Sequence, residues 1–159
     1  MKKIIGYLVL WLIGGVFLMV WQHFVELPAW YMENLLWVQC TLVGLIGGLI
    51  YCLRGVYLNK CVRKSWDKEW EVWYCLRPIT SAISGFVSFI FLKAGLLVLD
   101  AATKPEHISY GYLAIAFIAG YNVDNFMKKL EEVASTIWGI KQSRASQDFG
   151  GDSDKDKQQ

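Results

Sequence analysis

The sequence predicts an all-α integral membrane protein with four transmembrane helices, a cytosolic interfacial helix and a cytosolic extension of the fourth helix. Hydrophobic residues make up 55% of the chain and charged residues 19%, whereas about 25% of an ordinary soluble domain is charged. Long apolar runs recur along the chain, and the basic residues gather on one side of them. These patterns are typical of a helical protein that crosses a membrane several times.

The apolar runs place the four spans at about 4–21, 35–53, 79–99 and 108–123. A hydrocarbon core about 30 Å thick requires about 20 helical residues, so the first three runs fit and the fourth is short. Lysines precede the first run as in a signal peptide, but bulky residues follow it where a cleavage site would stand. We therefore expect an uncleaved span. The alternative, a soluble helical protein, leaves too little polar surface for so short a chain.

The distribution of Lys and Arg predicts the orientation. Two precede the first span, six lie between the second and third spans, and six follow the fourth. The two remaining connections contain only Lys104, together with acidic residues such as Glu26 and Glu33. By the positive-inside rule, both termini and the middle connection lie in the cytoplasm.

The connection between the second and third spans carries a helical stripe of aromatic residues. Trp66, Trp70 and Trp73 share one face, which predicts an interfacial helix at about 62–75 with its aromatic side among the lipid headgroups. The alternative is a docking face for a soluble partner. Asp124, where the fourth span leaves the bilayer, is a further candidate residue of such an interface.

The residues beyond the fourth span predict a cytosolic helix at about 126–140 and a disordered cytoplasmic tail at 141–159. The helix carries apolar residues spaced four and three apart. This seam either packs against the interfacial helix or joins several subunits in a cytosolic bundle. The tail is rich in Ser, Gln, Gly, Asp and Lys, and it has too little apolar surface to offset the entropy of ordering it.

Small residues recur within the spans at intervals of four. Gly44 and Gly48 form a GxxxG pattern in the second span, and Ser81 and Gly85 lie four apart in the third. Such residues let helix backbones approach closely in lipid, where the hydrophobic effect does not drive helices together. These four residues are therefore candidate contacts, either between the helices of one monomer or between the subunits of a homo-oligomer.

Lys93 is the only charged residue within a predicted span. A charged side chain at the centre of a membrane helix costs about 2.5–3.5 kcal/mol on insertion scales. The long side chain of Lys93 either extends to the nearby surface or enters a polar cavity, where Asp100 is its candidate partner. Lys93 and Asp100 thus form a candidate intramembrane polar site.

The sequence contains no recognisable catalytic set and no phosphate-binding glycine loop, so we do not expect an enzyme. The four cysteines form no CxxC motif, and His23 and His107 lie towards the opposite surface. We therefore expect no metal site, no cofactor and reduced thiols. A net charge of +2 gives no reason to expect direct binding to nucleic acid.

Several residues resemble a group of small, largely uncharacterised multi-span bacterial inner-membrane proteins. The likeness lies in Arg77-Pro78 at the entry to one span, in Gly85 and Gly95, and in the stretch Ala116-Phe117-Ile118-Ala119-Gly120-Tyr121 at the end of the next. By architecture the chain is also similar to the transmembrane effectors of phage-defence operons, including those of retrons. That resemblance implies a protein that damages the host membrane when a partner releases it.

These features lead us to expect an oligomerising inner-membrane protein that acts on the lipid bilayer under the control of a cytosolic protein partner, as the toxic effector of an antiviral defence system does. The first alternative is a non-toxic membrane anchor or accessory subunit for a soluble partner. The second is a small channel or carrier.

Overall fold

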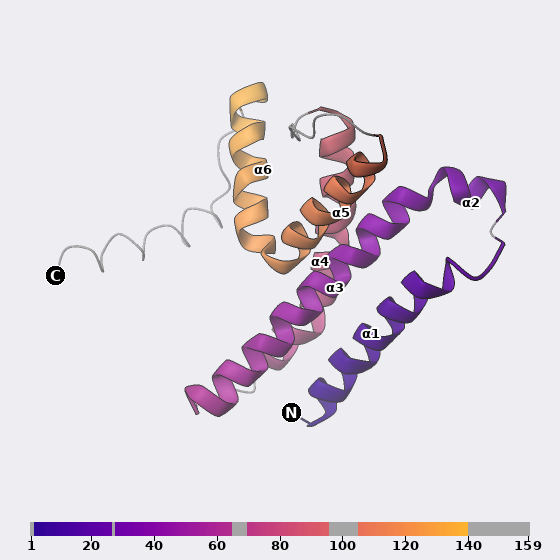
Figure 1. Ribbon diagram of the computed structural model, residues 1–159. Coiled ribbons are helices and arrows are strands. Elements are labelled where there is room, and N and C mark those ends of the chain that lie inside the picture. The colour runs from indigo at the N-terminus through magenta and orange to yellow at the C-terminus, as the bar shows by residue number, and fades with distance from the viewer. Residues whose placement is uncertain (1, 27, 65–69, 96–104, 140–159) are drawn as a thin grey trace. The chain divides into compact units, whose positions relative to one another are not determined.

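Every regular element in the described part of the chain is a helix, so the expected all-α fold is confirmed (Figure 1). The computed structural model describes residues 2–26, 28–64, 70–95 and 105–139. Some expectations lie outside the described residues, namely those for Trp66, for Asp100, for the tail at 141–159, for residues 65–69 of the interfacial helix and for residues 96–99 of the third span.

Three helices are long and apolar enough to cross a membrane: α1 (Lys2–Trp21), α3 (Leu35–Tyr57) and α4 (Trp70–Lys93). Their apolar stretches have 19, 28 and 24 residues, because that of α3 continues through the π-helical turn η1 (Leu58–Val62). At a rise of 1.5 Å per residue, each measures at least about 28 Å, close to the thickness of a hydrocarbon core. These helices agree with the predicted class of membrane protein.

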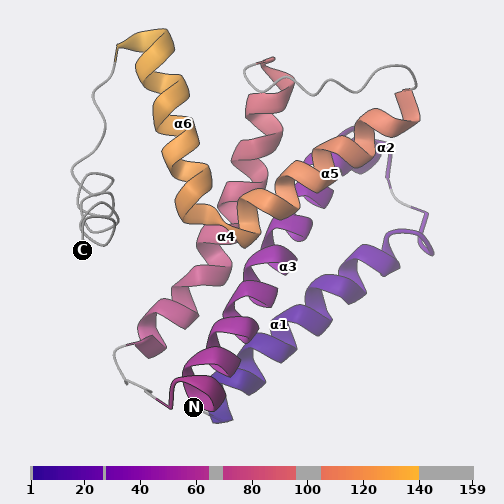
Figure 2. The same ribbon diagram turned by 60° about the vertical axis from the view of Figure 1, so that its left-hand side comes forward.

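The chain divides into two compact units, Met1–Val123 and Asp124–Gln159. In the first unit, α3 contacts α1, α4 and α5 (Pro105–Tyr121), as Figure 2 shows. A short helix, α2 (Ala29–Glu33), joins α1 to α3 where the sequence indicates a loop. Only 17% of the apolar stretch of α1 is buried, against 39% for α3 and for α4. Helix α1 therefore presents most of its apolar surface outwards, as a lipid-facing helix does.

Helix α5 ends beside the middle of α3. A β-carbon on Gly47 would lie 2.6 Å from the carbonyl oxygen of Phe117 and 3.0 Å from the backbone nitrogen of Tyr121. Gly47 lies near the midpoint of α3, seven residues and thus roughly 10 Å from the level of Arg54. The apolar helical part of α5, Tyr110–Tyr121, is shorter than a span. Helix α5 as a whole has 17 residues and overlaps the fourth span predicted at 108–123, which the structure leaves unconfirmed.

In the described part of the interfacial helix predicted at 62–75, residues 70–75 belong to a longer helix, because α4 runs from Trp70 through Pro78 to Lys93. Proline lacks an N–H group and usually interrupts a helix. Membrane helices tolerate it where neighbouring helices satisfy the freed backbone groups, and Pro78 is fully buried against such neighbours. Residues 70–75 are therefore the first turns of a long helix.

Helix α4 also ends earlier than the predicted span at 79–99. Gly95 follows it with a φ of 73°, and its N–H donates to the carbonyl of Leu92 at 3.0 Å. Glycine adopts this left-handed conformation at little cost, so it is the usual residue just beyond a helix end. The sequence prediction ran past Gly95 because the residues after it are also apolar.

The predicted extension of the fourth helix is instead a second helix, α6 (Val123–Trp138), which follows a turn at Asn122. Helix α6 lies almost entirely in the second unit. It ends before Gly139, which has a φ of 66° and donates its N–H to the carbonyl of Ser135. The helix is thus close to the predicted range of 126–140 but does not continue α5.

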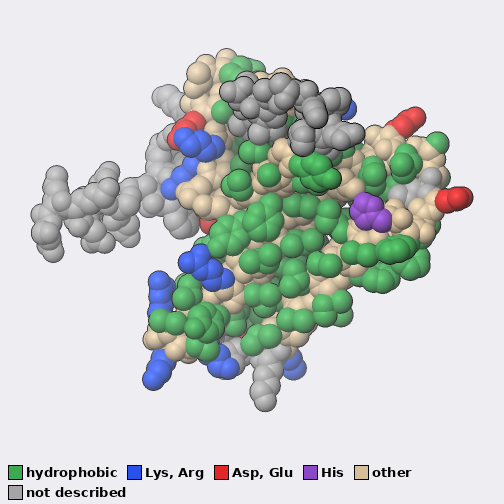
Figure 3. All heavy atoms as spheres, viewed as in Figure 1, with side chains coloured by type: hydrophobic (Ala, Val, Ile, Leu, Met, Phe, Trp, Pro, Cys, Tyr) green, Lys and Arg blue, Asp and Glu red, His purple; other side chains and the backbone are tan. Residues whose placement is uncertain are grey.

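Most charged side chains of the first unit gather by sign at opposite ends of the helices, whereas Lys93 lines the same pocket as Glu33. Figure 3 shows Lys and Arg side chains where α1 begins and α3 ends, and acidic side chains near α2. The described basic residues at the first end are Lys3, Arg54, Lys60, Arg63 and Lys64. Such a separation is the spatial form of the charge asymmetry that membrane proteins show across a bilayer.

Candidate functional site

The most unusual side chain in the first unit is Arg77, which is only 5% exposed although it carries a permanent charge. Its guanidinium carbon lies 5.0 Å from the ring centroid of Tyr51 and 5.0 Å from that of Trp73. The negative faces of these rings attract the cation, most strongly where water is excluded. Arg77 is therefore held in place by α3 and by its own helix.

A second arginine links α3 to the end of α5. The Nη1 atom of Arg54 donates to the hydroxyl of Tyr121 at 2.8 Å. The Tyr121 ring also packs on Tyr51, with centroids 5.5 Å apart and planes at 89°. Because Arg54 is exposed and lies in the last turn of α3, its long side chain spans the distance to the shorter helix. Through Tyr121, the exposed guanidinium group of Arg54 is thus hydrogen-bonded to the end of α5, beside the middle of α3.

A polar pocket, here called the basic pocket, opens beside these residues. Its volume is about 320 Å³. Asn59, only 9% exposed, donates its amide to the hydroxyl of the buried Tyr74 at 3.3 Å. The pocket is lined by Tyr51, Arg54, Gly55, Leu58, Asn59, Arg63, Trp70 and Tyr74. It thus contains two guanidinium groups and several aromatic rings.

Two predicted interface residues, Trp70 and Trp73, are 47% and 37% exposed. Trp70 lines the basic pocket. Trp73 packs on Tyr51 and Tyr74, with centroid distances of 6.0 and 5.1 Å. Both tryptophans therefore make contacts within the chain: Trp70 forms part of the pocket wall, and the ring of Trp73 contacts the guanidinium group of Arg77.

The four predicted small-residue contacts meet within one chain. A β-carbon on Gly44 would lie 2.7 Å from Cα of Gly85, and one on Gly48 would collide with the side chain of Ser81. All four residues are buried. Gly120 of α5 joins them, because a β-carbon there would overlap the carbonyl oxygen of Gly44. Of the two alternatives, the structure shows packing between helices of one monomer.

No family model, curated protein or solved structure matches this chain.

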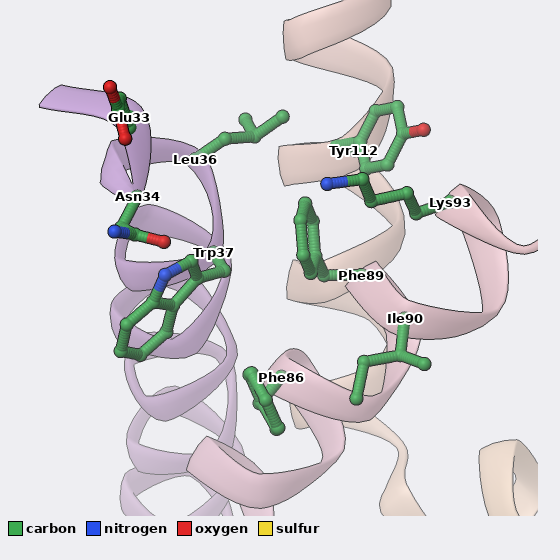
Figure 4. Close-up of a pocket in the computed structure, with 9 residues that line it drawn as sticks. All are labelled: Glu33, Asn34, Leu36, Trp37, Phe86, Phe89, Ile90, Lys93 and Tyr112. Carbon is green, nitrogen blue, oxygen red and sulfur yellow. The ribbon is translucent and has the colours of Figure 1, made fainter. Parts of the chain in front are cut away.

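Lys93 is the last residue of α4 and is exposed, so it lies at a helix end rather than inside a span. Its Nζ atom lies 5.6 Å from the centroid of Phe89. Figure 4 shows Lys93 at the edge of a pocket, here called the Lys93 pocket, of about 550 Å³. The pocket is lined by Glu33, Asn34, Leu36, Trp37, Phe86, Phe89, Ile90, Lys93 and Tyr112. Asp100, the predicted partner of Lys93, is not among the described residues.

Asp124 opens the second unit, where it lies in the first turn of α6 and is exposed. A carboxylate there is favourable because the first turn of a helix carries a partial positive charge. Further along α6, Lys129 and Glu132 form an exposed ion pair of 2.7 Å. Exposed pairs contribute about 0–1 kcal/mol, so this pair adds little to stability.

Sequence reasoning missed Arg54 and Asn59 as members of the basic pocket, and it missed Arg77 as a buried neighbour of Tyr51. It assigned both arginines to a cytosolic connection because they flank apolar runs. The available signal was Arg77-Pro78, since both residues lie inside α4 and are buried there. The nearness of Arg54 to Tyr121, 67 residues away, has no counterpart in the spacing of the sequence.

Proposed function

We propose that this chain is a bacterial inner-membrane protein with four membrane-inserted helices, and that it acts on the membrane under the control of a cytosolic partner. Its basic end, with Arg54 and Arg63, lies in the cytoplasm, and both termini lie on that side. The observation that supports an action on the membrane is the end of α5 beside Gly47, near the midpoint of α3.

In a bilayer, this geometry places the end of α5 close to mid-depth. The last carbonyl groups of a helix have no partner within it, and each unsatisfied backbone group in hydrocarbon costs several kcal/mol. Such an end requires protein or water around it. Arg54 already reaches Tyr121 from the basic end. We infer a polar notch that admits water from the cytoplasm to the middle of the membrane. The cytosolic partner controls whether this notch opens through the rest of the membrane.

Expression of the full chain tests this function. Induced cells should lose membrane potential, as read by a potential-sensitive dye, and the purified protein in liposomes should pass ions. Gly47→Ala should alter both readouts, because its β-carbon meets the α5 backbone at 2.6 Å. Gly14→Ala is the matched control, since nothing lies within 4 Å of its β-carbon. Normal potential and growth at high expression, with tight liposomes, would contradict the proposal.

The notch itself has a separate test. A single cysteine at Asn122, in a chain with its four native cysteines replaced by alanine, should react with a water-soluble thiol reagent in inverted membrane vesicles. The same reagent added to intact spheroplasts should leave it unmodified. An Asn122→Cys protein that reacts from neither side would show that water does not reach the end of α5.

The second candidate is a membrane anchor for a soluble partner. It is favoured by the closed packing of Gly44 and Gly85 within one chain, which leaves these residues unavailable to a second subunit. In this case the second unit, with α6, is the docking element. Purification in mild detergent distinguishes the two, because an anchor should bring down its partner in stoichiometric amount and leave the membrane potential intact.

A further inference from the structure

We propose that the basic pocket binds a phosphate group, either that of a phospholipid headgroup or that of a small soluble phosphate compound. The inference is independent of how the protein acts on the membrane. It rests on the side chains that line the pocket, on the backbone that positions them, and on the level of the pocket along α3.

The lining of the pocket suits a phosphate. Arg54 and Arg63 both line it, and none of the described residues that line it is acidic. A guanidinium group presents N–H donors in a planar fork that matches two phosphate oxygens. The amide of Asn59 is a third polar group in the wall, oriented by its hydrogen bond to Tyr74. A volume of about 320 Å³ falls at the lower end of the range of about 300–1,000 Å³ for ligand sites.

The π-helical turn reduces the angle around the helix axis between Arg54 and Arg63, and both side chains line the pocket. In a continuous α-helix, residues nine apart lie about 180° apart around the axis and face opposite ways. In η1 the N–H of Arg63 donates to the carbonyl of Leu58 at 2.9 Å, five residues back, so the chain winds more slowly. Lys64, with a φ of 53°, then ends the turn. Such turns are rare and occur frequently at functional sites.

The level of the pocket favours a lipid as the source of the phosphate. Arg54 is 19 residues after Leu35, where α3 begins, which corresponds to about 28 Å. The pocket therefore lies where a hydrocarbon core would give way to headgroups. Trp70 and Tyr51 in its wall are residue types enriched at this boundary. Basic pockets between membrane helices on the cytoplasmic side are known to accept anionic headgroups.

Native mass spectrometry of the full chain in detergent tests the proposal with three probes. Phosphatidylglycerol should remain bound, whereas diacylglycerol with the same acyl chains and no phosphate should not. Glycerol phosphate added in excess shows whether the bound phosphate group must belong to a lipid. Displacement of phosphatidylglycerol would mean that the phosphate group alone is recognised, and retention would mean that the lipid is required. Equal binding of phosphatidylglycerol and diacylglycerol, or binding of neither phosphate compound, would overturn the proposal.

Matched variants locate the binding. Arg63→Gln should weaken phosphatidylglycerol binding about tenfold, since a charged hydrogen bond contributes about 1.5 kcal/mol or more. Arg63 is exposed, so this variant should fold. Lys60→Gln removes the same charge from the same turn, at an exposed residue outside the pocket lining, and should bind as the unmodified chain does. Equal losses in the two variants would show a general charge effect and no site.

Discussion

The Cα atoms of Gly44 and Gly85 face each other across the contact between α3 and α4. A β-carbon on Gly44 would lie 2.7 Å from Cα of Gly85, and one on Gly85 would lie 2.9 Å from Cα of Gly44. Gly120 of α5 approaches the same residue of α3 from another side. Three helices therefore meet at Gly44 with their backbones in contact, which is the close approach that stabilises helix pairs in lipid.

Gly44→Ala should destabilise the protein by about 1–3 kcal/mol, because the added methyl group meets backbone atoms that cannot move independently. The measurement is unfolding by increasing SDS in mixed micelles, followed by circular dichroism. Gly14→Ala is the control, since its β-carbon has open space and alanine favours a helix. Equal stability of the two variants would mean that α3 and α4 do not pack at Gly44.

Arg77→Lys should also destabilise the protein, by about 1–2 kcal/mol, although it keeps the charge. Lysine lacks the planar group that lies 5.0 Å from both the Tyr51 and the Trp73 ring. The same change at the exposed Arg63 should have little effect on unfolding. If the two variants unfold at the same SDS concentration, the aromatic contacts of Arg77 contribute nothing to stability.

Tyr121→Phe should loosen the end of α5, because it removes the acceptor of the Arg54 hydrogen bond. The expected loss is about 0.5–1.5 kcal/mol, because water competes with an exposed hydrogen bond even when the donor is charged. Tyr110→Phe on the same helix is the control, because Tyr110 is 70% exposed. In a double-mutant cycle with Arg54→Gln, the two changes should be non-additive. Strict additivity would show that the two residues do not interact.

Cys61 should be modified only from the cytoplasmic side. It is exposed in η1, at the basic end, whereas Cys40 and Cys52 are buried. In a Cys75→Ser variant, a membrane-impermeant maleimide should therefore label Cys61 in inverted vesicles and leave intact spheroplasts unlabelled. Labelling in intact spheroplasts would place the basic end outside the cytoplasm and reverse the proposed orientation.

The sequence predicted the helical class and the first two spans well, because both depend on composition and length. Uncharged runs long enough to cross a bilayer require helices, since hydrocarbon offers no partner for backbone groups. Helix ends were predicted less well. Gly95 stops α4 inside an apolar run, and Pro78 does not interrupt α4 although proline usually interrupts a helix. The burial of Pro78 depends on neighbouring helices, which local patterns do not include. Gly95 ends α4 through its own left-handed conformation, which hydropathy does not register.

The sequence by itself determined that this protein has long apolar helices and that its charges divide between their two ends. The tertiary structure alone decided what those residues contact. It assigned Gly44 and Gly85 to packing within one chain, ended α5 beside the middle of α3, and buried Arg77 between two aromatic rings. The physical reason is that hydropathy and length act along the chain, whereas close backbone approach and stacking join residues far apart in it.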